Sequence, residues 1–168
     1  PDAYRAAVAR EIEFIGAGHA FQINLPQLFT TPQTAPVSLI YQRIMQRSPA
    51  TYGGLLDFGD FALICNSPEL FLRISPSVGM ELRRIVTRPI KGTRPRVDDL
   101  ARNDALIAEL QSSRKDRAEN VMIVDLLRND LSRIAKPGSV TVPMLCGLES
   151  YANVHHLVSV VTAQARDD

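Results

Sequence analysis

Apolar side chains recur at two different spacings along the first third of the chain. Between residues 2 and 16 they lie three or four positions apart, which predicts an amphipathic helix. Residues 20–25 alternate between apolar and polar side chains until Pro26, which predicts a strand. The helical spacing returns over residues 36–47, and the Ser-Pro pair that follows predicts the end of a second helix.

Short alternating segments occupy the next part of the chain. Turn residues of the Gly, Asp, Ser and Pro types separate them, and this spacing favours an antiparallel meander. The predicted strands are residues 52–58, 61–66, 70–75 and 80–87.

Two helices and two further strands are predicted after residue 97. Asp98 or Asp99 is expected to begin a helix to about residue 111, and a Ser-x-x-Asp capping pattern at 113–116 begins a longer helix to about residue 135. The longer helix has five apolar side chains that we expect to face inward: Val121, Met122, Leu126, Leu127 and Ile134. The last strands are expected at residues 139–145 and 153–162. Because no βαβ rhythm is present, the predicted fold class is α+β, with helices packed on antiparallel sheets.

Composition narrows the class of protein. A chain of 168 residues with 45% hydrophobic and 22% charged residues is long enough for one domain with a sizeable core. A net charge of +1 provides no field for nucleic acid or a membrane surface, and no apolar run approaches a membrane span. Cys65 and Cys146 each lie in an apolar run, which favours buried thiols of a reduced, cytoplasmic protein over a disulfide framework.

One basic stretch, residues 88–96, combines a lysine with two prolines and a glycine. The prolines exclude a regular helix or a central strand, so a stiff loop is expected. Gly92 permits positive φ or a close backbone approach. Lys91 is then either part of a phosphate-contacting patch or a reactive amine whose pKa the nearby cations lower. Composition alone slightly favours the patch, although no aromatic residue interleaves it.

Three other residues are candidates for chemistry, each with an ordinary structural alternative. Glu119 heads an apolar helix face and is either an ion-pair partner of Lys115 or a ligand of Mg²⁺. Glu69 follows a Ser-Pro turn at a strand end, where a surface carboxylate and a catalytic acid are both plausible. His156 shares an apolar strand face, where a core histidine is the common outcome and a catalytic one the alternative.

Taken together, the motifs resemble those of the chorismate-utilising enzymes, which include component I of anthranilate synthase and of aminodeoxychorismate synthase. The matching stretches occur in the family's order and span nearly the whole chain. They are Phe21–Leu25, Ser67–Phe71, Arg88–Arg96, Lys115–Leu131 and Val154–Ser159. The resemblance implies an antiparallel α+β chorismate-binding fold.

Within this family, two positions separate the reactions. The resemblance implies lysine at position 91 in enzymes similar to aminodeoxychorismate synthase and typically alanine in anthranilate synthase. Members that add water carry a lysine where this chain has Gln22, and an amide cannot deprotonate water near neutral pH. Lys91 with Gln22 therefore favours amination at C4 of chorismate, on the route to p-aminobenzoate and folate.

The resemblance also implies a mechanism. Lys91 attacks C2 of chorismate while Glu69 protonates the departing C4 hydroxyl, and ammonia from a glutamine amidotransferase then adds at C4 and expels the lysine. Mg²⁺, held partly by Glu119, clamps the ring carboxylate, which His156 approaches. Gly92 and Thr93 contact substrate.

Residues 1–168 are expected to be an internal piece of such a catalytic domain. Family members continue beyond the histidine strand with a substrate-binding arginine and a second magnesium glutamate. We therefore expect this chain alone to be inactive, or nearly so, and prone to self-association through open sheet edges. The alternatives are anthranilate synthase component I and a non-catalytic chorismate-binding module.

Overall fold

The N-terminal part of the molecule is a helix followed by irregular chain. The computed structural model describes residues 2–76 and 83–166, and it divides into two compact units, Pro1–Thr34 and Ala35–Asp168. The first unit contains α1 (Asp2–Gly16), which confirms the first predicted helix. Gly18, with φ of 79°, turns the chain directly after it.

The predicted strand at residues 20–25 is wrong. This segment is irregular, and the described part of the N-terminal unit contains no strand with which it pairs. Alternation of side chains predicts a strand only where a partner backbone satisfies its N–H and C=O groups. Here the carbonyl of Leu25 accepts a hydrogen bond from the Tyr4 hydroxyl at 3.2 Å instead.

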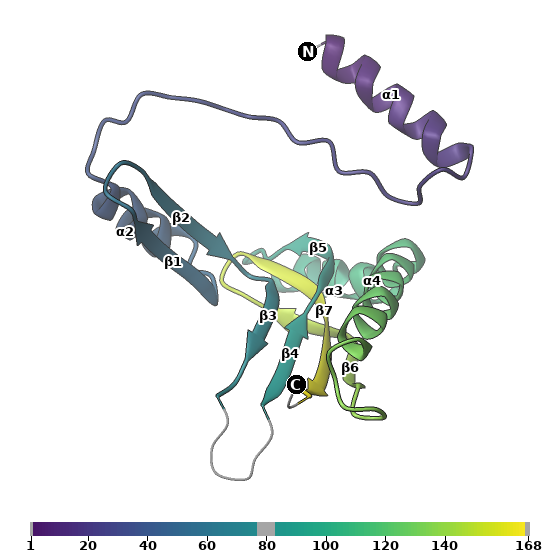
Figure 1. Cartoon of the computed structure of the whole chain (residues 1–168). Helices are drawn as coiled ribbons and strands as arrows, with labels where there is room; N and C mark the ends of the chain where they lie inside the picture. The colour runs from purple at the N-terminus through teal and green to yellow at the C-terminus, as the bar shows by residue number, and fades with distance from the viewer. Residues whose placement is uncertain (1, 77–82, 167–168) are drawn as a thin grey trace. The chain divides into compact units, whose positions relative to one another are not determined.

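The second unit begins with a helix and a two-stranded hairpin, both as predicted. They are α2 (Val37–Arg47), β1 (Tyr52–Asp57) and β2 (Ala62–Ser67), and the two strands pair antiparallel (Figure 1). The turn between them is closed by the Asp57 carboxylate, which accepts a hydrogen bond of 2.9 Å from the Gly59 N–H. Gly59 has φ of 87°, which suits a residue without a Cβ.

Among the described residues, the main sheet has five strands, with the long strand β7 (Val154–Gln164) at its centre. They are β3 (Leu70–Ile74), β4 (Arg84–Arg88), β5 (Ile90–Pro95), β6 (Thr141–Ser150) and β7 (Val154–Gln164). Strand β7 pairs antiparallel with β4, β5 and β6, and β3 pairs with β4. The expected four-strand meander is therefore wrong, because β1 and β2 form one sheet while β3 and β4 belong to another. The chain changes sheets at the Ser-Pro break that follows β2. Residues 80–82 of the fourth predicted strand lie outside the described residues.

The expected loop at residues 88–96 is also corrected. Residues 90–95 form β5, which pairs with β7 along the same edge as β4. Pro89 lies between the two strands, and its carbonyl accepts a hydrogen bond from the Ser159 N–H at 3.0 Å. β5 pairs with β7 alone among the described strands, and an edge strand tolerates prolines because only one of its sides must supply ladder hydrogen bonds.

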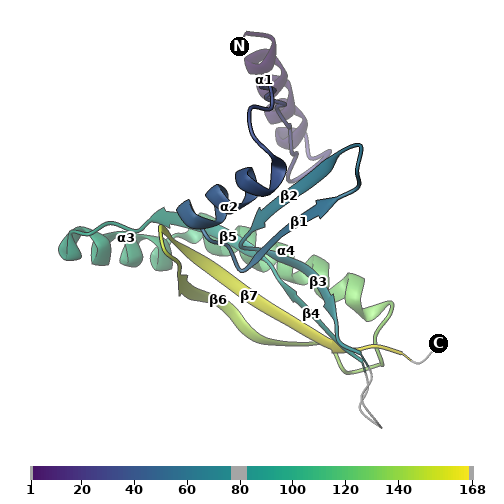
Figure 2. The ribbon, with the colours of Figure 1, turned by 90° about the vertical axis from the view of Figure 1, so that its left-hand side faces the viewer.

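Helices α3 (Leu100–Ser112) and α4 (Arg114–Ser132) cover one face of this sheet (Figure 2). Both begin with the predicted caps. Asp99 accepts a hydrogen bond from the Arg102 N–H at 2.8 Å, and the Ser113 hydroxyl accepts one from the Asp116 N–H at 3.2 Å. The helices contact β5 and β7, and the last turn of α3 and the first turn of α4 lie beside Gly92 and Arg94 of β5.

The inward face of α4 differs in part from the predicted one, although Leu127 packs against the core as expected. Asn120, Val124 and Leu131 are buried, whereas Val121 and Leu126 are 45% and 47% exposed. A buried asparagine carries no apolar signal, so the sequence pattern placed the inner face one position away. The core beneath α4 consists of Ile85, Val124, Leu131, Ala135, Val161 and Ala163.

Helices packed on antiparallel sheet make this an α+β fold, as predicted. Within residues 2–76 and 83–166, no helix combines the length and the apolar character that crossing a bilayer requires.

Candidate active site

A bulge in β5 lies at the candidate lysine, Lys91. Ile90 faces Val158 and Thr93 faces His156, so β5 advances three residues while β7 advances two. The extra residue falls within Lys91–Gly92, opposite Leu157. A bulge of this kind bends its strand and re-aims a side chain, and such bulges recur beside active sites. Lys91 therefore projects from an irregular point in an otherwise regular ladder.

Gly92 makes the bulge sterically feasible. Its φ is 88°, in the left-handed region that residues with a Cβ rarely adopt. A Cβ added there would lie 2.8 Å from the Cβ of Asp116 and 3.0 Å from Cδ1 of Leu110. Both predicted uses of this glycine, positive φ and close approach, are confirmed.

His156 lies across the ladder from Thr93 and contacts it directly. The Thr93 hydroxyl and His156 Nδ1 are 2.9 Å apart. Burial lowers the pKa of His156 below its ordinary value, outweighing a hydrogen bond to the Gly92 backbone and the negative charges of Glu149 and Glu69, which raise the pKa. The imidazole is therefore held towards its neutral form, in which one ring nitrogen accepts and the other donates.

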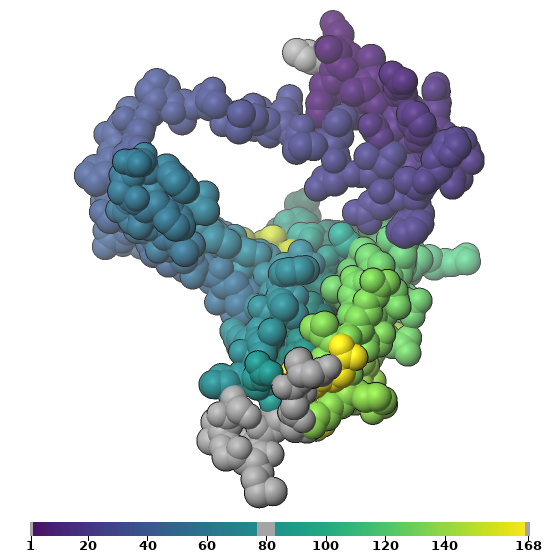
Figure 3. All heavy atoms as spheres, in the orientation of Figure 1, coloured from purple at the N-terminus to yellow at the C-terminus, as the bar shows by residue number. Residues whose placement is uncertain are grey.

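Glu69 is bound to the backbone beside the lysine. Its Oε1 accepts a hydrogen bond of 2.8 Å from the Ile90 N–H, while the Ser67 hydroxyl accepts a hydrogen bond of 3.1 Å from the Glu69 N–H. A cavity of about 290 Å³ adjoins Glu69, between β3, β4 and α4. Figure 3 shows the teal atoms of the strands next to the green atoms of α4 on this face. The cavity lining is Ser67, Glu69, Leu70, Phe71, Thr87, Pro89, Ile123 and Leu127.

A second polar chain, which the sequence pattern did not single out, supports His156. Arg88 forms an ion pair with Glu149, and the Tyr151 hydroxyl donates to the other oxygen of Glu149 at 2.7 Å. The Tyr151 ring meets the His156 ring edge-on, with centroids 5.5 Å apart. Burial and the Glu149 hydrogen bond raise the pKa of Tyr151, so its hydroxyl keeps its proton. The only sequence signal that could have found this polar chain is the charged and aromatic pair, Glu149 and Tyr151, just before the histidine strand.

His155, the neighbour of His156, is a structural residue. It is buried, and its Nδ1 and Nε2 lie 2.8 Å from the Ser150 hydroxyl and 2.9 Å from Asn103 Oδ1. Asn103 Oδ1 also accepts a hydrogen bond from the Val97 N–H at 3.2 Å. Both ring nitrogens are therefore satisfied on the helix side of the sheet. Alternate residues of a strand face opposite sides, which separates this pair of histidines.

Glu119 has different contacts from the other predicted site residues. Its Oε1 is 3.7 Å from Lys115 Nζ, the i, i+4 pair that the spacing allowed. Within the described residues it shares no hydrogen bond or ion pair with Lys91, Glu69 or His156.

The residues present do not make a complete metal site. Across residues 2–76 and 83–166, no group of three or more His, Cys, Asp or Glu side chains is arranged to hold an ion. A single carboxylate, 40% exposed and facing a lysine, suits at most one position of a water-rich Mg²⁺ shell. Among the described residues, Glu119 is therefore at most one carboxylate available to Mg²⁺, and no set of ligands is complete.

Gln22, the remaining candidate, belongs to the N-terminal unit. It is exposed and lies in the irregular segment that follows α1.

The site thus combines a lysine on a bulged strand with a nearby glutamate and histidine, in a chain whose whole sequence matches one family. The sequence profile for "chorismate binding enzyme" matches residues 1–168. The chain belongs to this family of chorismate-binding enzymes.

Curated relatives within the chorismate-binding enzymes carry two different names. Aminodeoxychorismate synthase of Streptomyces griseus is 42% identical over 92% of this chain and 21% of its own length. Aminodeoxychorismate synthase component 1 of Salmonella typhimurium is 40% identical over 92% of this chain and 33% of its own length. Anthranilate synthase component 1 of Thermus thermophilus is 41% identical over 95% of this chain and 33% of its own length. Overall identity therefore does not separate the two reactions.

A solved chorismate-binding enzyme supports the fold. The crystal structure of anthranilate synthase component I from Streptococcus pneumoniae matches with a TM-score of 0.66 and 30% identity. The match covers 81% of this chain and 28% of that protein. The chain spans a third or less of the length of each of these relatives.

Proposed function

We propose that this chain forms part of an enzyme that aminates chorismate at C4, giving 4-amino-4-deoxychorismate for p-aminobenzoate and folate synthesis. The observation that carries the proposal is the bulge at Lys91–Gly92, flanked by Glu69 on one side and the Thr93–His156 pair on the other. The aminodeoxychorismate synthase names of several relatives support it.

Lys91 is the proposed nucleophile. It is partly buried, and its ammonium group has no ion-pair partner within 4.0 Å among the residues the structure describes. Its neutral amine attacks C2 of chorismate, the two ring double bonds shift, and the C4–O bond breaks.

Glu69 and His156 take part in the same replacement of the C4 hydroxyl by an amine. Glu69, once protonated, donates its proton to the departing C4 hydroxyl, which leaves as water. Ammonia then forms a bond to C4, the double bonds shift back, and the Lys91 amine leaves C2. His156 lies near the ring carboxylate, and Gly92 and Thr93 contact substrate through backbone and hydroxyl groups.

Two further components belong to the proposal. Mg²⁺, with Glu119 as one ligand, supplies positive charge that stabilises the ring carboxylate when bound. Ammonia comes from a glutamine amidotransferase, separate or fused, a partner that the "component 1" in several relatives' names favours. We also propose that the protein acts in the cytoplasm.

The chain is proposed to act within a longer protein. It spans 33% of the Salmonella typhimurium relative, and the described residues do not complete a metal site. Within this proposal the 168 residues alone give little or no turnover with chorismate, Mg²⁺ and ammonium salt. Ready formation of aminodeoxychorismate by the chain alone would contradict this part of it.

The deciding experiment replaces Lys91 by Ala in the longer protein. We expect C4 amination to stop, with anthranilate appearing as a minor product, because direct addition of ammonia at C2 remains open. Products are separated by chromatography and identified by mass. Lys115→Ala is the matched control, since Lys115 is 81% exposed and pairs only with Glu119 among the described residues. Unchanged C4 amination by Lys91→Ala would refute the covalent role.

Anthranilate synthesis is the second candidate. The Thermus thermophilus relative, as similar as the aminodeoxychorismate synthases, favours it. Anthranilate as the main product of the unaltered protein would decide for it. Chorismate binding without turnover would instead indicate a non-catalytic binding module.

A further inference from the structure

Arg94 connects the bulged strand to both helices. Its Nε donates to Glu109 of α3 at 2.8 Å, and one terminal nitrogen lies 3.3 Å from Asp116 of α4. The other terminal nitrogen donates to the Thr93 carbonyl at 2.8 Å. All three guanidinium nitrogens are therefore used, on a side chain that is only 23% exposed.

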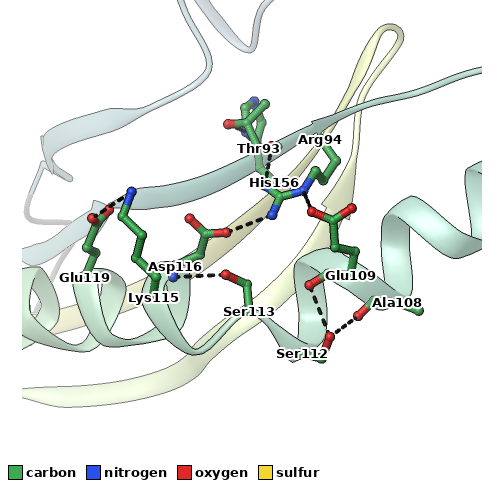
Figure 4. A network of polar contacts seen from close by, with 10 residues as sticks. All are labelled: Thr93, Arg94, Ala108, Glu109, Ser112, Ser113, Lys115, Asp116, Glu119 and His156. Atoms are coloured by element: carbon green, nitrogen blue, oxygen red, sulfur yellow. Dashed lines mark hydrogen bonds and ion pairs between the residues drawn. The ribbon is translucent and has the colours of Figure 1, made fainter.

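Asp116 contacts the bulge at a second point. Its Cβ and Cγ lie where a side chain on Gly92 would project, and its backbone N–H is capped by Ser113. Asp116 is thus fixed by the start of α4 and touches the residues on both sides of Thr93. Figure 4 shows Arg94 between Glu109 and Asp116, with the Thr93–His156 contact beside them.

A bulge needs such support because a strand has a more regular alternative. The pairing of β5 with β7 is made by backbone groups and does not itself require the extra residue. If the bulge relaxes by one residue, the side chains of Lys91 and Thr93 exchange faces of the sheet. The Thr93 hydroxyl would then leave the side on which it meets His156, and Lys91 would change direction with it.

We propose that Arg94 and Asp116 are positioning residues, which hold the Lys91–Gly92 bulge in register and so aim Lys91 and Thr93 at the substrate. Neither residue touches the reacting atoms in this role. The inference rests on the proposed function for its catalytic consequence, while its structural part concerns only the contact between Thr93 and His156.

The structural test uses the 168-residue chain and nuclear magnetic resonance of the His156 ring nitrogens. Arg94→Met keeps the aliphatic stem and removes the three donors, and we expect it to abolish the hydrogen-bond signature at His156 Nδ1. Asp116→Asn keeps the size of the side chain and the cap, and we expect a weaker change of the same kind. Glu109→Gln is the matched control, because Glu109 is 61% exposed and an exposed ion pair contributes little.

The kinetic test uses the longer protein with chorismate and ammonia. We expect Arg94→Met to lower kcat about 100-fold with a much smaller change in KM, since a displaced catalytic group slows the reaction more than it weakens binding. Arg94→Lys is expected not to restore kcat, because an ammonium group cannot make three divergent contacts. Glu109→Gln is expected to remain within about threefold of the unaltered protein.

The two tests separate the inference from the proposed function. If the unaltered protein does not aminate chorismate, the proposed function fails and the His156 signature still decides the role of Arg94. An unchanged His156 signature in folded Arg94→Met would overturn the inference. Should that variant fail to fold, as circular dichroism would show, Asp116→Asn decides alone, and an unchanged signature there has the same meaning. An equal change in Glu109→Gln would also overturn it.

Discussion

Gly92 shows how much of this site depends on a single residue. Its φ of 88° and the 2.8 Å between its would-be Cβ and Asp116 are both incompatible with a side chain. The neighbouring Lys91, Thr93 and Arg94 take their directions from the bulge that this glycine permits. At the residue scale, the directions of the side chains in the site therefore depend on the backbone conformation of Gly92.

Gly92→Ala tests this dependence. We expect the free energy of unfolding to fall by about 1–3 kcal/mol, because the alanine is both strained and crowded. The measurement is urea unfolding followed by circular dichroism. Gly54→Ala in β1 is the control, since nothing lies within 4 Å of its would-be Cβ. Equal effects of the two substitutions would contradict the argument.

His156 gives a second prediction at the residue scale. Since burial lowers its pKa in the folded state, the unfolded chain binds the proton more readily. The contribution of His156 to stability is therefore complete above its unfolded pKa of about 6.5 and is lost as the pH falls through that value. Urea midpoints at pH 7.5 and 5.5 should differ less in His156→Gln than in the unaltered chain. The same difference in both proteins would show that other groups carry the effect.

Helix α4 illustrates the element scale, because its buried face is defined by contacts and not by hydrophobicity alone. Asn120 is fully buried, donates to the Leu157 carbonyl at 3.0 Å and accepts a hydrogen bond from the Ser159 hydroxyl. That same hydroxyl accepts a hydrogen bond of 2.8 Å from the Cys146 N–H. A polar side chain thus fixes the rotation of the helix over β7, with apolar residues on either side of it.

The two valines of α4 distinguish the observed face from the predicted one. Val124 is 4% exposed and Val121 is 45% exposed. We expect Val124→Ala to cost about 1.5–3 kcal/mol of stability and Val121→Ala well under 1 kcal/mol. Thermal or urea unfolding of the two variants measures the difference. A larger loss for Val121→Ala would restore the face that the apolar pattern favoured.

The sequence predicted elements well where the signal was local. Asp99 and Ser113 cap helices as expected, since a cap involves residues only three positions apart. The prediction from sequence failed where pairing with a distant strand decides whether a segment becomes a strand. Residues 20–25 lack a partner strand in their own unit, and residues 90–95 gain one in β7 despite their prolines. The site followed the same rule: Lys91, Glu69 and His156 were singled out by type, whereas Arg88, Glu149 and Tyr151 emerged only from contacts across the fold.

At the scale of the whole molecule, many large apolar side chains remain at the surface of the described residues. Leu28, Phe29 and Phe71 are each more than 80% exposed. Strands β3 and β6 lie at the edges of the main sheet as described, and open edges of this kind pair readily with other chains.

We therefore expect the isolated 168-residue chain to self-associate. Sedimentation velocity over a hundredfold range of concentration should show a mass that rises with concentration. A Phe71→Lys variant in β3 should reduce the association, because charge on an edge strand opposes pairing. A chain that stays monomeric throughout this range would contradict the expectation.

The central position of β7 has a consequence for the order in which the molecule forms during synthesis. Strands β5 and β6 pair with β7 alone among the described strands, and β7 ends at Gln164, 69 residues after β5 ends at Pro95. A ribosome adds about 5–20 residues per second, so β5 waits for its partner on the order of 3–14 s. The lysine strand therefore emerges early and is organised late, and its bulge cannot form until the histidine strand has left the ribosome.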